Sequence, residues 1–348
     1  MWPDGRYRDL LGSRLPIISA PMAGAGGVEL AVGAIAGGAV GSLPCALLTH
    51  DEAVAQVTEV RARADGPLNL NFFCHKIPES EEDGAWRSVL KPFYEVLGVV
   101  PDQGAPLRRP FDEGMCSAVE HVRPELVSFH FGLPEDALLD RVRRSGARIL
   151  GNATTVAEAR ALAARGVDAI IAQGWEAGGH AGRFLDAPSD EAMGLIALVP
   201  QVADATALPV IAAGGIADGR GMAAALTLGA TAVQIGTAYL LCPESLITSA
   251  HRATLSGTAA EHTAFTNLFS GGLARGLPAR LTDELGRIRP EAPPFPLASA
   301  ALAALAKAAD GFAPMWSGQS ASLARPMPAR DLTEQLGREA LALINRTS

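Results

Sequence analysis

Eight short apolar segments recur along the chain, separated by longer stretches rich in Ala, Leu and Arg. The segment at residues 210–213, Val-Ile-Ala-Ala, is apolar at every position, as expected of a strand that is buried on both faces. Strands of this kind that alternate with helices form parallel sheets. The expected strands span residues 16–20, 41–43, 68–73, 126–130, 148–152, 169–173, 209–213 and 232–235. Eight is the strand number of a closed TIM-type (β/α)8 barrel.

An open, doubly wound sheet that binds a dinucleotide is the alternative fold. The loop Gly24-Ala25-Gly26-Gly27 leads from the first expected strand into an expected helix over residues 28–36 and resembles a dinucleotide fingerprint. Glu29 stands where that fingerprint needs its third glycine for close packing of the helix on the strand. The sequence therefore favours the barrel.

Two parts of the chain interrupt the alternation. Residues 75–114 are rich in Pro, Gly and charge, which predicts an inserted loop with a helix around residues 85–97. A regular helix over residues 51–64, with Asp51 as its cap, precedes this insertion. After residue 255 the alternation ends, so we expect a barrel over residues 1–255 and a mostly helical lid over the barrel mouth at residues 256–348.

Charge and cysteine content exclude several classes of function. The formal net charge is -8 and Lys and Arg form no local cluster, so we expect no binding to nucleic acid and no protein partner is implied. The four cysteines, at positions 45, 74, 116 and 242, are too widely spaced for a zinc site. They are best interpreted as reduced thiols of a cytoplasmic protein without a catalytic metal.

No segment has the pattern of a secretory signal or a membrane span. The first residues lack a basic flank followed by an apolar run. Residues 28–48 are apolar, but Glu29, Pro44 and several glycines interrupt them. A helix, a turn and a buried strand explain this stretch better than a membrane span does.

A glycine-rich loop with a central histidine follows the sixth expected strand. It runs Gln173-Gly-Trp-Glu-Ala-Gly-Gly-His-Ala-Gly182, and loops at strand ends are where α/β proteins bind ligands. Glycines let the backbone approach a flat or anionic ligand, and His180 can exchange protons near neutral pH. Glu176 in the same loop is expected to cap a helix or face solvent. The loop therefore predicts an enzyme site.

Other strand ends supply donors and acceptors. In β/α barrels the loops after the seventh and eighth strands commonly bind phosphate, so we expect Gly215, Gly236 and Thr237 at a phosphate group. The side-chain amides of Asn71 and Gln173 suit the edge of a heteroaromatic ring such as an isoalloxazine. For either amide alone, hydrogen bonding to nearby backbone is an equal alternative.

The motifs at these strand ends resemble those of a known family. Segments 21–23, 69–75, 173–182, 213–216 and 234–237 are similar, in the same order, to the motifs of the nitronate monooxygenases, formerly called 2-nitropropane dioxygenases. The resemblance extends to Trp316-Ser317-Gly318-Gln319. It implies that His180 is the catalytic base and that FMN lies across the barrel mouth. The implied flavin contacts are Met22, Asn71, Gln173, Gly178, Gly179, Gly214, Gly215, Gln234, Ile235, Gly236 and Thr237.

The resemblance also implies the reaction. Members of the family oxidise an alkyl nitronate with O₂, using FMN, to a carbonyl compound and nitrite; a neutral nitroalkane needs a base that first removes its α-proton. His130 and Ser317 are the candidate substrate contacts. Ala181 occupies a position where many relatives carry another residue, often Arg, which puts substrate preference in doubt.

Three alternative functions remain. The first is an NAD(P)H-dependent flavin reductase of the enoyl-acyl carrier protein reductase or quinone reductase type, although the chain has no separate dinucleotide fingerprint. The second is a flavin-binding module without turnover. The third is a flavin-free barrel isomerase or aldolase, which is disfavoured because no lysine stands at an expected strand end.

Overall fold

All eight predicted strands are present in the computed structural model, which describes residues 2–80, 82–101, 107–185 and 191–347. They are short, and most of their residues are buried because helices cover the sheet outside and side chains fill the barrel inside. Their bounds are β1 (Ile17–Ser19), β2 (Gly41–Pro44), β3 (Leu68–Phe73), β4 (Leu126–His130), β5 (Arg148–Ala153), β6 (Ala169–Gln173), β8 (Val210–Ala213) and β9 (Ala232–Ile235).

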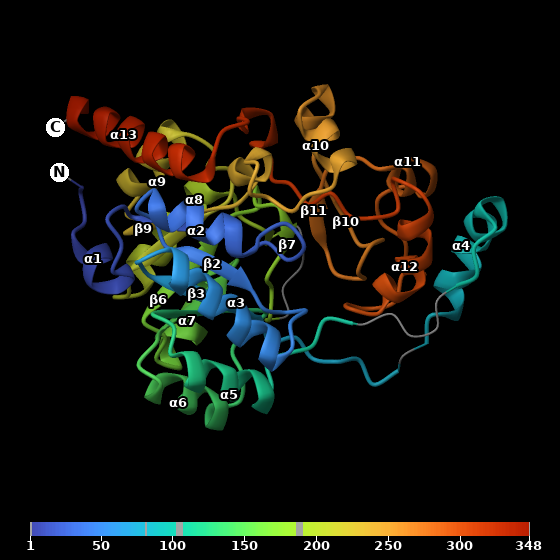
Figure 1. The fold of residues 1–348 in the computed structure, drawn as a ribbon, viewed down its shortest axis with the longest axis horizontal. Coiled ribbons are helices and arrows are strands. Elements are labelled where there is room, and N and C mark those ends of the chain that lie inside the picture. Colours follow the sequence, from blue (N-terminus) through green and yellow to red (C-terminus); the bar gives the residue numbers. More distant parts are fainter. Residues whose placement is uncertain (1, 81, 102–106, 186–190, 348) are drawn as a thin grey trace.

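The strands form a closed parallel barrel (Figure 1). Their order is β1-β9-β8-β6-β5-β4-β3-β2, with every neighbouring pair parallel. A parallel bridge between Ile18 and Val40 joins the two ends of this sheet. There the Ser19 N–H donates to the Val40 carbonyl at 3.0 Å, and the Val40 N–H donates to the Ile17 carbonyl at 2.9 Å. The predicted (β/α)8 barrel is therefore confirmed, and the open sheet is excluded.

Eight helices surround the strands. Their apolar faces share one core with the outward side chains of the strands. Helix α3 begins at His50, and its N-cap is Thr49. The side chains of Thr49 and Glu52 form a reciprocal capping box, so the prediction of Asp51 as the cap is wrong. The bounds are α2 (Val28–Ala36), α3 (His50–Arg63), α5 (Glu113–Val122), α6 (Asp136–Arg144), α7 (Val156–Ala164), α8 (Leu195–Ala205), α9 (Gly219–Thr227) and α13 (Ala329–Thr347).

The last of these helices corrects the expected lid. α13 packs against α9 and α2 on the wall of the barrel, not over its mouth. Small residues allow this close contact: a Cβ on Gly37, the residue that follows α2, would lie 2.5 Å from the Thr333 Cβ. The Tyr239 and Thr333 hydroxyls also share a hydrogen bond of 2.6 Å. α13 is thus the eighth helix of the barrel, and residues 236–328 form an excursion between β9 and this helix.

One end of the barrel is plugged. Helix α1 (Arg6–Leu11) places Tyr7, Leu10 and Leu11 in a cluster with the inward side chains of the strands, among them Leu126 and Ala232 at the strand starts. The Tyr7 hydroxyl donates to the Arg14 carbonyl at 3.1 Å, which holds the plug in place. The barrel interior is therefore accessible from the carboxyl ends of the strands.

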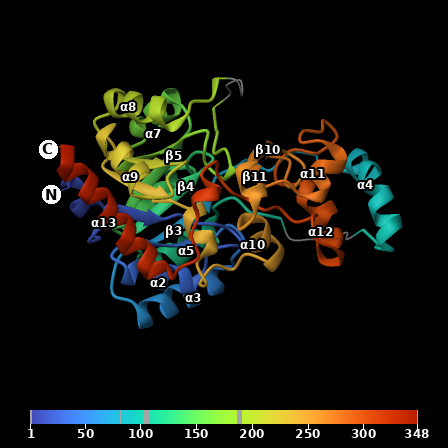
Figure 2. The same cartoon turned by 90° about the horizontal axis from the view of Figure 1, so that it is seen from above.

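A smaller lobe lies beside the barrel mouth (Figures 1 and 2). The inserted helix α4 (Gly84–Leu97) packs on α12 (Ala298–Ala308), and the two share a core that includes Trp86 and Phe312. An antiparallel sheet of β10 (Ala264–Thr266), β11 (Ala274–Gly276) and β7 (Gly179–His180) connects this lobe to the histidine loop. The other helices of the excursion are η2 (Thr237–Leu241), α10 (Ser249–Leu255), η3 (Thr258–Glu261), α11 (Arg280–Leu285) and η4 (Ala321–Leu323).

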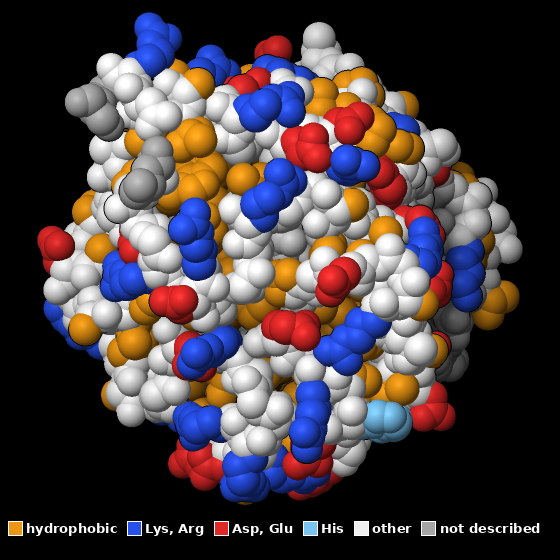
Figure 3. Space-filling model, turned by 60° about the vertical axis from the view of Figure 1, so that its left-hand side comes forward, with side chains coloured by type: hydrophobic (Ala, Val, Ile, Leu, Met, Phe, Trp, Pro, Cys, Tyr) orange, Lys and Arg blue, Asp and Glu red, His pale blue; other side chains and the backbone are white. Residues whose placement is uncertain are grey.

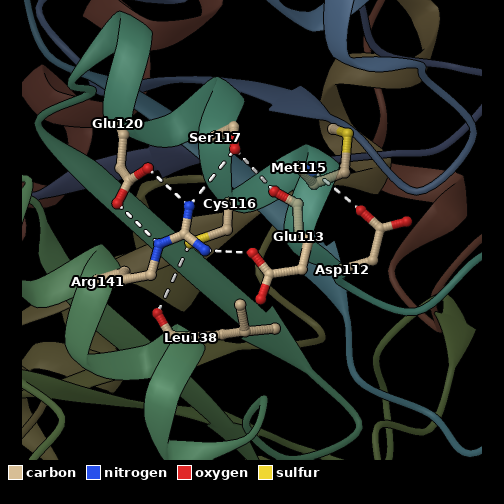
Figure 4. A network of polar contacts seen from close by, with 8 residues as sticks. All are labelled: Asp112, Glu113, Met115, Cys116, Ser117, Glu120, Leu138 and Arg141. Carbon is tan, nitrogen blue, oxygen red and sulfur yellow. Dashed lines mark hydrogen bonds and ion pairs between the residues drawn. The ribbon is translucent and has the colours of Figure 1, made fainter.

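Charged side chains join neighbouring wall helices on the outside of the barrel. Arg141 of α6 donates from Nε and Nη2 to the Glu120 carboxylate of α5 at 2.9 and 2.8 Å, and it also contacts Glu113 (Figure 4). These two carboxylates raise the pKa of Arg141. Figure 3 shows basic and acidic side chains interspersed over the described part of one face. No described helix has the length and apolar character needed to cross a lipid bilayer.

Candidate active site

A cavity of about 450 Å³ lies at the carboxyl ends of the barrel strands and extends under the smaller lobe. Its volume is in the range of sites for small molecules and cofactors. Strand alternation sends every second side chain inward, and residues near the ends of β3, β4, β5, β6, β8 and β9 reach this cavity. The predicted residues that line it are Met22, Asn71, His130, Gln173, Gly178, Gly179, His180, Gly214, Gly215, Gln234, Gly236 and Thr237.

Two predicted residues lie outside the cavity lining. Ile235 points outward and packs in the core between strands and helices. Ser317 is fully buried, and its hydroxyl lies 3.2 Å from Nε2 of His251. In this geometry His251, which sequence reasoning did not select, reaches the cavity, and Ser317 supports it from behind.

Gln173 at the end of β6 holds the histidine loop in place. Its Oε1 accepts from the Gly182 N–H at 2.8 Å and from Nδ2 of Asn152 at 3.1 Å. Its Nε2 donates to the His180 carbonyl at 2.9 Å. The alternative role for this amide, hydrogen bonding to nearby backbone, is thus present in the structure, while the residue still lines the cavity.

The His180 ring is buried beside the cavity in an aromatic surrounding. Its centroid lies 4.9 Å from that of Phe295, 5.5 Å from Trp316, 6.0 Å from Phe131 and 6.3 Å from Phe73. Nε2 lies 2.8 Å from Oγ of Ser270, and Nδ1 has no hydrogen-bond partner among the described residues. The ring orientation is therefore held from one side, and one nitrogen is left for a ligand.

Burial keeps the histidines of this site neutral. It lowers the pKa of His180 well below its usual value, and the positive charge of Arg108 lowers it further. Burial also lowers the pKa of His130, and that of His75 behind it, to about 4. At neutral pH the imidazole of His180 is uncharged and can accept a proton.

Two strand-end amides are available to a ligand. Asn71 donates from Nδ2 to the Ser128 hydroxyl at 2.9 Å, and its Oδ1 has no partner among the described residues. The side chain of Gln234 at the end of β9 has no hydrogen bond within the described part of the chain, and its Oε1 is buried. A buried amide without partners is costly unless a ligand satisfies it.

The glycine loops after β6, β8 and β9 lie close together at the same rim. A Cβ on Gly178 would lie 2.6 Å from the Gly318 nitrogen, so only glycine allows the two backbones to approach this closely. The Gly318 N–H donates to Oγ1 of Thr237 at 2.9 Å. Thr237 begins the short helix η2, whose first N–H groups have no intrahelical acceptor. This rim can accommodate an anionic group.

Glu176 has a structural role. Both carboxylate oxygens accept from the Leu195 N–H at 2.9 Å, where helix α8 begins. This is the capping role expected from the sequence. Arg275 supports the same loop from below, because its Nε and Nη2 donate to the Trp175 carbonyl at 3.2 and 3.0 Å.

Sequence reasoning missed Arg108, which lines the cavity from the inserted segment. The insertion has no regular pattern, so nothing in the sequence indicates which of its charged residues turns inward. The structure shows why it does: the Phe111 N–H donates to the Phe73 carbonyl at 2.7 Å and ties the segment to the end of β3. Trp316 lies in the motif at residues 316–319 but was not selected as a site residue, and Phe295 was not selected at all.

Comparison with known proteins assigns this chain to a family. The family model described as nitronate monooxygenase matches residues 6–339. The chain belongs to the nitronate monooxygenase family. It is 42% identical to the nitronate monooxygenase of Paraburkholderia phytofirmans over 95% of this chain and 93% of that protein. The identity to the nitronate monooxygenase of Pseudomonas aeruginosa is also 42%, over 96% and 98% of the two chains.

Solved structures agree with this assignment. A nitroalkane oxidase from Streptomyces ansochromogenes superposes with a TM-score of 0.87 at 34% identity, covering 98% of this chain and 99% of that one. FabK from Thermotoga maritima superposes with a TM-score of 0.77 at 25% identity, covering 98% and 97%. Nitronate monooxygenases are flavoprotein oxidoreductases, and the chain is an enzyme of this kind.

Proposed function

We propose that this chain oxidises alkyl nitronates with O₂ to a carbonyl compound and nitrite, and that its flavin is FMN. The observation that carries the proposal is the neutral His180 ring, which lies at the cavity between unsatisfied amides and an aromatic wall. Family membership supplies the reaction class.

The cavity fits a flavin mononucleotide. Gln234 and Asn71 offer amide groups to the edge of a planar ring. Met22, which also lines the cavity, lies close to Gly236 at the end of β9. The rim formed by Gly215, Gly236 and Thr237 offers backbone N–H groups to a phosphate. FMN, when bound, would carry electrons between the substrate and oxygen.

His180 is the proposed catalytic base. Because its imidazole is neutral at neutral pH, Nδ1 can accept the α-proton of a neutral nitroalkane. A substrate that arrives as the nitronate has already lost this proton. With such a substrate His180 would instead orient the anion by a hydrogen bond from the same ring.

The test compares His180→Asn with the wild-type enzyme. Asparagine keeps a polar group of similar reach but cannot accept a proton, so kcat with nitroethane should fall by about 10²- to 10⁴-fold. Turnover of ethyl nitronate should fall much less, and the flavin content should not change. His262→Asn, at an exposed histidine, is the matched control and should match the wild-type enzyme in all three measurements.

Oxygen consumption and nitrite release distinguish the alternatives. A yellow protein that is bleached by NADH and does not turn over ethyl nitronate would be a flavin reductase. A yellow protein without either activity would be a flavin-binding module. Ethyl nitronate and O₂ are the expected small-molecule partners, and the cytoplasmic location stays a prediction.

A further inference from the structure

Arg108 carries the only positive charge of Lys or Arg among the described residues that line the cavity. Its guanidinium forms no ion pair or hydrogen bond within the described part of the chain, and its Nε is buried. The three histidines of the lining, His130, His180 and His251, all have lowered pKa values and are uncharged at neutral pH. An anion that enters this cavity therefore has Arg108 as its available counter-charge.

An unpaired guanidinium in such a place is costly to the folded protein. Burial removes water from the group and lowers its pKa, yet no carboxylate of the described residues forms an ion pair with it. Elsewhere on the surface of this chain arginines pair with acidic residues, as Arg141 does with Glu120. A cavity-lining arginine left without a partner indicates a site for a ligand anion.

The barrel topology separates this charge from the phosphate rim. Arg108 lies near the end of β3, because Phe111 bonds to Phe73 and the Arg108 backbone lies beside the His75 ring. The phosphate rim follows β8 and β9. In the closed order, β3 is four strands from β8 and three from β9, so the two sites face each other across the mouth. Arg108 is therefore on the substrate side.

His180 lies on the same side as Arg108. The His180 ring centroid lies 6.3 Å from that of Phe73, whose carbonyl accepts from the Phe111 N–H and so holds the segment that carries Arg108. Phe73 and Trp316 line the cavity around His180 and offer apolar surface to an alkyl chain. A planar anion with two oxygens fits the fork of a guanidinium, and a nitronate group has this shape.

We propose that the guanidinium of Arg108 binds the two oxygens of the substrate's nitronate group and makes this enzyme select nitronate anions over neutral nitroalkanes. The identity of the anion rests on the proposed function. The existence of an anion site beside His180 does not. Arg108 is thus a substrate-binding residue that determines specificity.

The experiment compares Arg108→Gln and Arg108→Lys with Arg109→Gln. Arg109 is exposed and adjacent, so its variant has the same change in net charge without a change in the cavity. In Arg108→Gln we expect KM for ethyl nitronate to rise by about 10- to 100-fold because a charge-assisted bidentate contact is lost. The preference for ethyl nitronate over nitroethane, as a ratio of kcat/KM values, should fall by the same factor. Arg108→Lys should recover part of this preference for ethyl nitronate.

A second measurement needs no turnover. Propionate resembles the nitronate in shape and charge, and propionamide is its neutral counterpart. Propionate should raise the melting temperature of the wild-type enzyme and of Arg109→Gln but not of Arg108→Gln, and propionamide should raise none of them. Without ligand, Arg108→Gln should melt at or above the wild-type temperature, because a partly buried charge that has no ion-pair partner among the described residues is removed. If Arg108 had a purely structural role, Arg108→Gln would instead melt below the wild-type temperature.

Each failure has a distinct signature. Unchanged KM and unchanged propionate response in Arg108→Gln would overturn the anion site while leaving the proposed function intact. A wild-type enzyme that ignores ethyl nitronate but responds to propionate through Arg108 would overturn the proposed function alone. If Arg108→Gln raises KM only for a nitronate that also carries a carboxylate, and not for ethyl nitronate, the assignment of Arg108 to the nitronate oxygens is wrong.

Discussion

Glu158 offers a sharp test of how the histidine loop is held, because it lies outside the cavity. This carboxylate is 1% exposed and accepts four hydrogen bonds. Oε2 accepts from the Thr154 N–H at 2.7 Å and from its hydroxyl at 2.8 Å. Oε1 accepts from the N–H groups of Phe184 and Leu185 at 2.8 and 3.2 Å. Glu158 thus joins the end of β5 to the chain that returns from His180.

The expected loss in Glu158→Gln follows from these contacts. The amide can place its oxygen toward Phe184 and Leu185 and its NH₂ toward Thr154. The Thr154 hydroxyl can then turn and accept, so only the Thr154 N–H loses its partner. One charge-assisted hydrogen bond is lost and the other three become neutral, which lowers the free energy of unfolding by about 2 to 4 kcal/mol. Glu158→Ala loses all four bonds and should be the less stable of the two variants.

Urea denaturation followed by circular dichroism measures this loss, and amide hydrogen exchange at residues 184 and 185 localises it. Glu29→Gln is the control, because Glu29 pairs with Arg63 on the surface and the variant should keep the wild-type midpoint. A Glu158→Gln variant with the wild-type midpoint and wild-type exchange would refute the argument that this carboxylate anchors the loop.

Three further predictions concern the site. Gly178→Ala brings a Cβ to 2.6 Å from the Gly318 nitrogen, so the loops must separate and the flavin content of the purified protein should fall by about tenfold. Gln173→Leu leaves three polar groups unsatisfied and should lower the free energy of unfolding by about 3 kcal/mol or more in urea, whereas the exposed Gln201→Leu should not. Burial lowers the pKa of His251 to about 4, so only the unfolded chain takes up a proton between pH 6.5 and 4. The free energy of unfolding therefore falls as the pH is lowered from 6.5 to 4, by up to about 1.4 kcal/mol per pH unit for this residue. His251→Gln should make this dependence on pH less steep.

Each of these predictions has a contrary outcome. Full flavin content in Gly178→Ala would show that the loops can separate without cost. A Gln173→Leu variant as stable as Gln201→Leu would mean that water satisfies the polar groups. An unchanged acid slope in His251→Gln would mean that His251 is already protonated in the folded enzyme.

The barrel could be predicted because its signal is local. Each strand is an apolar run that ends in a polar or glycine residue, and strand ends meet at one face of a barrel whatever the loops do. His180, Asn71 and Gln234 were therefore found at the cavity. The cap of α3 was misplaced although the sequence carries the reciprocal pair Thr49 and Glu52.

Contacts between distant segments could not be predicted in this way. Arg108 reaches the cavity because a backbone hydrogen bond ties its irregular segment to β3. The partner of His180, Ser270, is 90 residues away along the chain. The role of α13 also depends on the whole fold: an apolar stripe of Ala329, Leu332 and Leu336 predicts a buried helix face but not the surface that buries it.

The place of α13 in the wall has a consequence for how the chain is made. The neighbours of this helix are α2 and α9, and both leave the ribosome before α13 does. Until α13 has been made, the faces of α2 and α9 that it covers in the folded protein are exposed in the nascent chain. A chain truncated before Ala329 keeps every strand and every cavity residue that we name, yet exposes this apolar seam to proteases and chaperones. The wall of the barrel is therefore complete only when this helix has been made.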